Sequence, residues 1–383
     1  MRVGAQLVTE TTETDAVPRG VTYGETRITQ PIVMVRAGTA GNRLMLFLTT
    51  DFEGATALHG ILTPGDWGES FIDRRHPHTY VHELMLLAPD LLRDVRAPVH
   101  LALGLGKGFA PFGTDDPMSR PVERFPVNHH LSQILERAVG LGALSRGPVR
   151  LEGSLFNGDE PVGPNSWPKL SRFGDSWSVR LTVRPVAGLE WQGSRAVVTS
   201  PEVRDGGGLD QFKWSTSLRW ERAVGGHPLY AEAEWARTDL GASTYVLSSV
   251  LVEGEVTLGV HRPYFQIERS ERPEDERTLD PYRLQRPIVE NSILGITRWT
   301  IVTLGYGIDL HPPVPVTVRP YAEGSLYDIA KVGSGIFDPA VFYGPGRHWG
   351  VTAGVKILWQ MPGHRMGRYE EPQAGMPGMA GGR

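Results

Sequence analysis

Apolar and polar residues alternate strictly between Gln211 and Arg237. In the first half, mostly apolar side chains take the even positions and polar ones the odd positions: Phe212, Trp214, Thr216, Leu218 and Trp220 stand against Gln211, Lys213, Ser215, Ser217, Arg219 and Glu221. After turn residues 225–228, the return run sets Leu229, Ala231, Ala233 and Trp235 against Tyr230, Glu232 and Glu234. Successive side chains of a β-strand point to opposite faces, so the stretch predicts a hairpin with one apolar wall and one charged wall.

Two folds accommodate such a hairpin. In a soluble β-sandwich the apolar wall packs against a second sheet and the charged wall faces water. In an outer-membrane β-barrel the apolar wall contacts lipid and the charged wall lines a wet lumen. The rest of the chain distinguishes the two.

Period-two segments recur along the whole chain, whereas helical periodicity is scarce. They predict strands at residues 2–10, 26–39, 42–54, 79–91, 97–109, 130–145, 148–157, 175–185, 188–199, 211–224, 228–239, 243–253, 255–270, 292–310, 315–327 and 348–360. Short turns alternate with long loops between them, with the short turn at 240–243 as an exception and a tight turn expected at Gly254. Such sorting is typical of outer-membrane barrels, and a sandwich has no reason for it. We expect residues 1–361 to form one all-β, antiparallel transmembrane β-barrel of about 16 strands, with long extracellular loops and short periplasmic turns.

The last predicted strand carries a tryptophan at each end, Trp349 and Trp359. At about 3.3 Å per residue and a tilt of roughly 40°, they stand about 25 Å apart along the barrel axis. The two aromatic girdles of a membrane barrel are separated by about that height. We expect the girdles to include Trp214, Trp220, Trp349 and Trp359.

Composition narrows the partners and the chemistry. The 383-residue chain has a formal net charge of −4. A nucleic-acid-binding protein usually has a strongly basic surface, so this charge argues against a nucleic-acid partner. The absence of cysteine excludes disulfides, thiolate metal sites and iron–sulfur clusters, and it suits an oxidising compartment. No apolar run reaches the roughly 18 residues of a transmembrane helix.

The two ends of the chain carry their own expectations. The first residues, MRVGAQLVTE, lack a charged segment followed by an apolar core and form no signal peptide. Because an outer-membrane protein must be exported, we expect that a signal sequence has been removed or that translation starts upstream. Residues 362–383 are rich in Gly, Pro and Met and predict a disordered tail.

The densest polar cluster closes the first large loop, and a pair of histidines closes a later one. Imidazole and carboxylate groups suit zinc, copper or nickel, although the spacing matches no zinc motif. The alternative is a hydrogen-bonded plug in which both loops fold into the barrel mouth. The cluster comprises Asp73, Arg74, His76, His78, Glu83, His129 and His130. The candidate metal ligands are His76, His78, His129 and His130, and we expect no other cofactor.

The charged positions on the predicted inner wall carry both signs. They are Arg150, Glu152, Arg180, Arg184, Lys213, Arg219, Glu221, Glu232, Glu234, Arg319, Glu323 and Lys356. Because the signs are mixed, a pore lined by these side chains would show weak ion selectivity.

No catalytic motif stands out. The sequence lacks G-x-S-x-G, and the glycine-rich stretch 104–108 lacks the spacing of a phosphate-binding loop. We therefore expect no enzymatic activity.

Several stretches resemble a family of uncharacterised bacterial outer-membrane porin-like proteins with D-R-x-H-P-H-D and E-G-S-x-F-N-G motifs in this order. They are Asp73–His78, Gly108–Gly113, His129–His130 and Leu151–Gly158. The resemblance covers roughly residues 72–222, and Thr79 stands where the family usually has Asp. It implies a location and an architecture rather than a transported solute.

These observations predict a porin-like barrel in a Gram-negative outer membrane, for passive or gated diffusion of small solutes or ions. Its partners would be outer-membrane lipid and those solutes. A homo-oligomer is compatible with this class, although no stretch marks a subunit interface. Two alternatives stay open: a plugged structural or copper- or zinc-binding surface barrel, and a soluble carbohydrate-binding β-sandwich.

Overall fold

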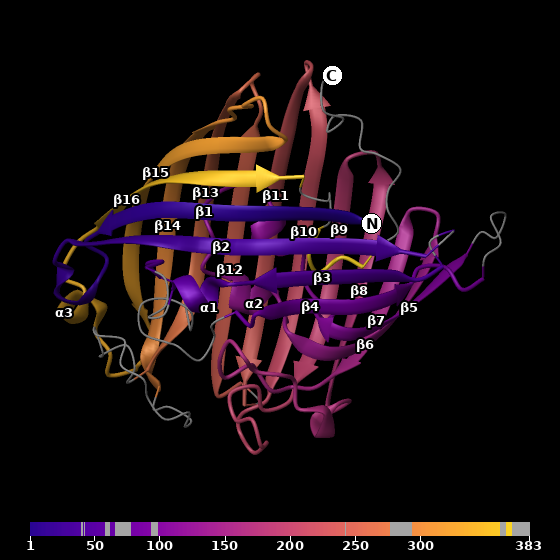
Figure 1. Cartoon of the computed structure of the whole chain (residues 1–383). Coiled ribbons are helices and arrows are strands. Elements are labelled where there is room, and N and C mark those ends of the chain that lie inside the picture. The colour runs from indigo at the N-terminus through magenta and orange to yellow at the C-terminus, as the bar shows by residue number, and fades with distance from the viewer. Residues whose placement is uncertain are drawn as a thin grey trace.

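The alternating stretch forms the hairpin of β10 (Gln211–Val224) and β11 (His227–Leu240) in the computed structural model (Figure 1). Its register is unbroken, from Gln211 opposite Leu240 to Val224 opposite His227. The polar residues at odd positions of β10 up to Arg219 are buried, and Leu218 and Trp220 are 49% and 41% exposed. The two walls of the hairpin therefore face the barrel interior and exterior.

The strands close into a single antiparallel barrel with sixteen strands in the described part of the chain. The structure describes residues 1–39, 41, 43–57, 62–65, 78–92, 99–241, 243–275, 293–360 and 365–369. Each strand pairs with its neighbours in sequence, and β1 pairs with β16 from Ala5 opposite Trp359 to Thr14 opposite Gly350. This closure leaves no sheet edge unpaired, and it excludes the two-sheet sandwich.

The remaining strands match the predicted segments closely. They are β1 (Arg2–Thr14), β2 (Tyr23–Gly38), β3 (Met45–Asp51), β4 (Val81–Ala88), β5 (His100–Gly108), β6 (Arg137–Arg146), β7 (Val149–Phe156), β8 (Ser176–Val186), β9 (Leu189–Val198), β12 (Tyr245–Val256), β13 (His261–Asp275), β14 (Ile293–Ile308), β15 (Val316–Val332) and β16 (His348–Trp359). Short helical turns lie in the connections: η1 (Pro18–Gly20), α1 (Glu53–Thr56), η3 (Pro117–Ser119), α2 (His129–Ser132), η4 (Leu170–Arg172) and α3 (Pro339–Phe342). Among these described elements, no helix has the length and apolar character needed to cross a membrane.

Two boundaries differ most from the prediction. The sixth segment was expected to start at residue 130, but helix α2 occupies 129–132 and β6 begins at Arg137. Gly254 was expected to make a tight turn, but it pairs with Phe265 inside β12, and the turn lies at 257–260. A glycine can replace a side chain where a neighbour packs closely, and the Phe265 ring fills the space that a Cβ on Gly254 would need.

Short and long connections between strands lie at opposite ends of the barrel. One end has short connections such as 147–148, 187–188 and 225–226. The other end has long ones such as 109–136 and 157–175. The predicted alternation is confirmed, including its short exception before β12. The long connection 109–136 between β5 and β6, here called the lumen loop, positions the candidate site.

Candidate functional site in the barrel lumen

The lumen loop lies against the inner wall rather than outside the barrel. Lys213 Nζ of β10 donates to the carbonyl of His130 at 2.8 Å, and Gln266 Nε2 of β13 donates to the carbonyl of Arg124 at 3.1 Å. A loop without strand neighbours must pair its buried backbone groups in some other way, and here inward side chains of the wall do so. The loop is thereby tied to β10 and β13, two strands that do not pair with each other.

Arg120 fastens the loop to an acidic patch on β11 and β12. Its guanidinium nitrogens lie 3.5 Å from Glu253 Oε1, 3.6 Å from Glu234 Oε2 and 4.0 Å from Glu232 Oε1. All four side chains are buried almost completely. Buried carboxylates are costly unless paired, so Arg120 stabilises the patch and the patch holds the loop.

Glu123 fastens the same loop to a different part of the wall. Arg319 Nη1 of β15 donates to Glu123 Oε1 at 2.6 Å, and Lys356 Nζ of β16 donates to Oε2 at 2.8 Å. Burial raises the pKa of the Glu123 carboxyl, but the positive charges of Lys356 and Arg319 outweigh burial, and the pKa lies below its ordinary value. The carboxyl is therefore ionised at neutral pH.

The chain re-enters the barrel after β16. Residues 365–369 were predicted to be part of a disordered tail, but the structure describes them as an ordered segment in the lumen. Arg365 Nη2 donates to Asp115 Oδ1 of the lumen loop at 2.7 Å and to Glu190 Oε1 of β9 at 3.0 Å. The prediction of disorder failed for these residues because amino-acid composition carries no information about ion pairs with distant residues. The rest of the predicted tail lies outside the described residues.

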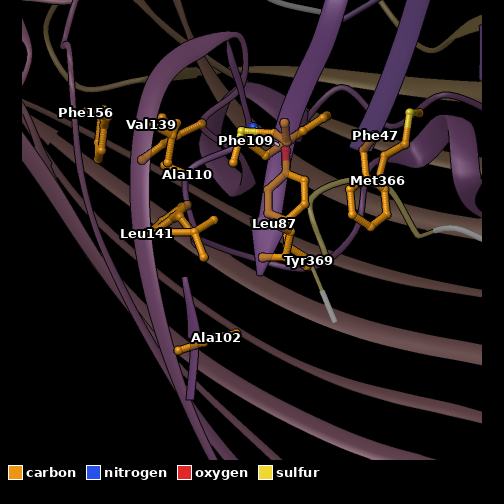
Figure 2. Packing of buried hydrophobic residues seen from close by; sticks show 14 of the residues in the cluster. Phe47, Leu87, Ala102, Phe109, Ala110, Val139, Leu141, Phe156, Met366 and Tyr369 are labelled. Carbon is orange, nitrogen blue, oxygen red and sulfur yellow. Dashed lines mark hydrogen bonds between the residues drawn. The ribbon is translucent and has the colours of Figure 1, made fainter. Parts of the chain in front are cut away.

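Apolar contacts complete the anchoring of residues 365–369, here called the tail segment. Figure 2 shows Met366 and Tyr369 among side chains of the strands and the lumen loop. The Tyr369 ring meets Phe47 of β3 edge-on at 5.9 Å, and its hydroxyl accepts from the backbone N–H of Phe109 at 3.0 Å. Arg150 donates to the carbonyl of Tyr369 at 2.8 Å. The lumen loop and the tail segment thus form one plug, joined to each other and to the wall.

The inner wall under this plug carries a large apolar patch. Its buried side chains on β3 to β7 are Met45, Phe47, Met85, Leu87, Ala102, Val139, Leu141, Ala143 and Phe156. The outward positions of the same strands are also apolar, for example Leu86 and Leu105. A wall that is apolar on both faces needs a protein cover on its inner side, and the plug supplies it.

Ten of the twelve predicted inner-wall charges are buried inside the barrel. They are Arg150, Glu152, Arg180, Lys213, Arg219, Glu232, Glu234, Arg319, Glu323 and Lys356, while Arg184 and Glu221 are partly exposed. Many of these charges are paired: Arg180 Nε lies 2.7 Å from Glu152 Oε2, and Arg184 Nη2 lies 2.8 Å from Glu190 Oε2. Their side-chain direction is as predicted, and their role in lining a pore stays a prediction.

The predicted polar cluster is brought together only in part. Asp73, Arg74 and His76 lie outside the described residues. Glu83 is buried on β4, where its carboxyl accepts from Thr49 Oγ1 at 3.0 Å. His129 and His130 lie on α2, with ring centroids 4.2 Å apart. His78 instead forms a group with His82 and Glu136, two residues outside the predicted cluster.

The four girdle tryptophans point outward. Trp220 and Trp359 are 41% and 36% exposed, and Trp214 and Trp349 are partly exposed. Their contact with a membrane stays a prediction.

Sequence reasoning missed the charged residues that hold the plug, namely Arg120, Glu123 and Arg365. One signal was available, because each lies in a Pro-containing segment without strand periodicity. A charge in such a segment is ordinarily solvated, so only the fold identifies its partners.

Comparisons with known proteins identify the fold and no family. No family model and no curated protein matches the sequence. The anion-selective porin from Comamonas acidovorans matches in structure with a TM-score of 0.51 at 9% identity, over 93% of this chain and 98% of that one. A loop L8 deletion mutant of OmpT, an outer membrane protein of Vibrio cholerae, matches with a TM-score of 0.50 at 12% identity, over 93% and 98%. Salmonella typhi OmpF in complex with daunomycin matches with a TM-score of 0.50 at 10% identity, over 93% and 97%.

Proposed function

We propose that this chain is a porin-like barrel of a bacterial outer membrane whose lumen is gated by the lumen loop and the tail segment. Small polar solutes or ions pass when the plug shifts from the wall. The outward apolar side chains support a lipid-facing exterior, because an exposed band of this kind is unfavourable in water. The fold shared with two porins supports the same class.

The observation that carries the gating proposal is the way in which the plug is held. Arg120, Glu123 and Arg365 join it to the wall through ion pairs, and no disulfide is available in a chain without cysteine. A buried ion pair is lost when one partner is neutralised or removed, so the closed arrangement depends on charge as well as on packing. A plug held in this way therefore suits a gate.

A pocket beside the plug supports a path for polar solutes. It lies between the lumen loop and the wall of β1, β2, β15 and β16. Its charged lining side chains are Glu10, Arg27, Glu53, Glu123, Arg124 and Glu323. Both signs are present, which supports the prediction of weak ion selectivity.

Conductance of the refolded protein in a planar bilayer tests the proposal. We expect brief and infrequent openings of the wild-type chain, because the plug occupies the lumen, and a reversal potential in a salt gradient close to zero. A folded protein that stays silent, even when its plug contacts are removed, would contradict the gated pore.

The second candidate is a permanently plugged structural barrel. The apolar patch on the inner wall of β3 to β7 favours it, because opening would expose this patch to water. Silence of both the wild type and the plug variants would favour this candidate. Neither candidate assigns catalysis to the chain. The absence of enzymatic activity and a homo-oligomer both stay predictions, and sedimentation of the detergent-solubilised protein tests the latter.

A further inference from the structure

Two imidazoles and a carboxylate converge inside the barrel at the base of the lumen loop. His78 precedes β4, His82 lies on β4, and Glu136 immediately precedes β6. One potential ligand atom from each lies within 4.8 Å of the other two, and all three residues are buried. We propose that His78, His82 and Glu136 bind a divalent transition-metal ion of the zinc class. This site differs from the four-histidine set predicted from the sequence and does not depend on whether the barrel conducts.

The backbone departs from regular geometry at two of the three residues. Thr49 pairs with Glu83 and Thr50 pairs with Val81, so His82 is the extra residue of a β-bulge. The bulge buries both His82 and Glu83, whereas regular pleating would send one of the two outward. Glu136 has a φ of +58°, a conformation that non-glycine residues rarely adopt. Such deviations persist where surrounding contacts hold a side chain in a particular place.

The distances suit coordination. His78 Nδ1 and His82 Nδ1 lie 3.3 Å apart. Two nitrogen ligands at about 2.0–2.1 Å from a tetrahedral zinc ion are separated by about 3.3–3.4 Å. His82 Nδ1 lies 2.7 Å from Glu136 Oε1, a hydrogen-bond distance that would lengthen by about half an ångström around an ion. Glu136 also accepts from the N–H of Thr79 at 2.8 Å, which fixes its carboxylate.

Further carboxylates surround the two imidazoles. Glu53 Oε2 lies 3.9 Å from His78 Nε2, the position from which a carboxylate orients a metal-bound histidine. Asp51 and Asp116 lie close enough to both imidazoles to interact with them electrostatically.

Unpaired oxygens point to a missing cation or its bound water. Asp51 Oδ2 and Asp116 Oδ2 are both buried and have no hydrogen-bond partner among the described residues. A buried polar atom without a partner is costly, and water held by an ion could donate to these oxygens. The ammonium of Lys107 is the opposing charge that also acts on Glu136. The carboxyl groups of Glu53, Asp51, Asp116 and Glu136 outnumber the cations Lys107 and Arg137 here, and a divalent cation would stabilise their ionised forms.

The types of ligand indicate which metal ion fits the site, and the adjoining pockets indicate where space for it lies. Two imidazoles with carboxylate oxygen suit zinc, copper or nickel better than magnesium or calcium. His78 lines the pocket between the lumen loop and β1, β2, β15 and β16 and also a second pocket, so space for an ion adjoins the site. Bound there, it would join β4 to the residue that ends the lumen loop.

Zinc binding by the refolded full chain tests the site. We expect competition with a chromophoric chelator to show one tight Zn²⁺ per chain, and His82→Asn to weaken it about 100-fold. Glu53→Gln, which removes only the orienting charge, should weaken it about 10-fold. His227→Asn, at an exposed histidine that begins β11, is the matched control and should bind as the wild type does. Heat-dependent mobility in SDS confirms that each variant is folded.

X-ray absorption spectroscopy of the zinc-loaded wild type identifies the zinc ligands directly, so the site can be tested even if a variant fails to fold. The expected first shell has two imidazole nitrogens together with oxygen. Equal zinc affinity of the wild type and the folded His82→Asn variant, or a zinc shell without two imidazoles, would overturn the proposal.

Discussion

At the residue scale, Arg120 is the side chain whose loss should affect the plug most. Arg120→Ala removes the paired guanidinium from the buried Glu234 and Glu253 and leaves Glu232 with Arg219, at a cost of about 3–5 kcal/mol to the closed arrangement. We expect longer and more frequent openings in single-channel recordings. The control is Arg347→Ala, which removes an exposed loop arginine and should leave the recordings unchanged. Equal opening frequencies in the two variants would argue against a role of Arg120 in holding the lumen loop against the wall.

The ion pairs of Glu123 predict a dependence on pH. Its pKa in the folded protein lies below the ordinary value near 4.5, because Lys356 and Arg319 outweigh burial. A depressed carboxyl pKa stabilises the docked loop above the ordinary value, and this stabilisation is lost as pH falls through the folded pKa. The plug should therefore be stable from neutral pH down to about 4.5 and should loosen at lower pH. Conductance recorded as the pH is lowered checks the direction.

A variant separates this effect from general acid denaturation. Glu123→Gln should open more often already at neutral pH, because its amide cannot balance two cations, and should respond less to acid. An acid response that Glu123→Gln leaves unchanged would assign the effect to another group.

At the scale of elements, the tail segment acts as a cover that is continuous with β16. Arg365 bridges Asp115 of the lumen loop and Glu190 of β9, so removal of the segment breaks a contact within the plug and one with the wall. We expect a chain ending at residue 360 to give a larger unitary conductance than the full chain. A chain ending at Tyr369 keeps every described contact of the segment and should conduct as the full chain does. Larger conductance from both truncations would place the closing contacts beyond residue 369.

The strands under the plug explain why a cover is needed at all. β4 and β6 are apolar at inward positions such as Met85, Leu87 and Leu141, whereas β10 alternates with polar inward side chains. The sequence shows this difference as runs such as LMLLA and AVGLGAL, which lack clean alternation. A strand apolar on both faces is buried on both. These runs predict a covered inner face, but they do not tell which segment covers it.

At the scale of the whole molecule, the exterior predicts how the protein sits in a bilayer. Trp220 and Trp359 are exposed on the outer wall, so lipids brominated near the headgroup should quench tryptophan fluorescence more strongly than lipids brominated at the chain ends. Trp299 is buried and 1% exposed, and Trp299→Phe should leave the pattern of quenching unchanged. No quenching by either lipid would contradict a lipid-facing exterior.

The sequence by itself determined the barrel. Strict alternation fixes the direction of each side chain, and the sorting of short and long connections requires an antiparallel meander with two unlike ends. From these two regularities the strand number, the inner charges and the outward tryptophans all follow, because each depends only on neighbours along the chain.

Only the tertiary structure decided what fills the barrel. The contacts between Arg120 and β12 or between Arg365 and Asp115 join residues more than a hundred positions apart, and composition assigned part of this set to a disordered tail. The group of His78, His82 and Glu136 depends on a bulge and on a left-handed residue, neither of which leaves a periodic trace in the sequence. Local pattern specifies which way a side chain points, whereas its partner across the lumen is specified only when the sheet closes.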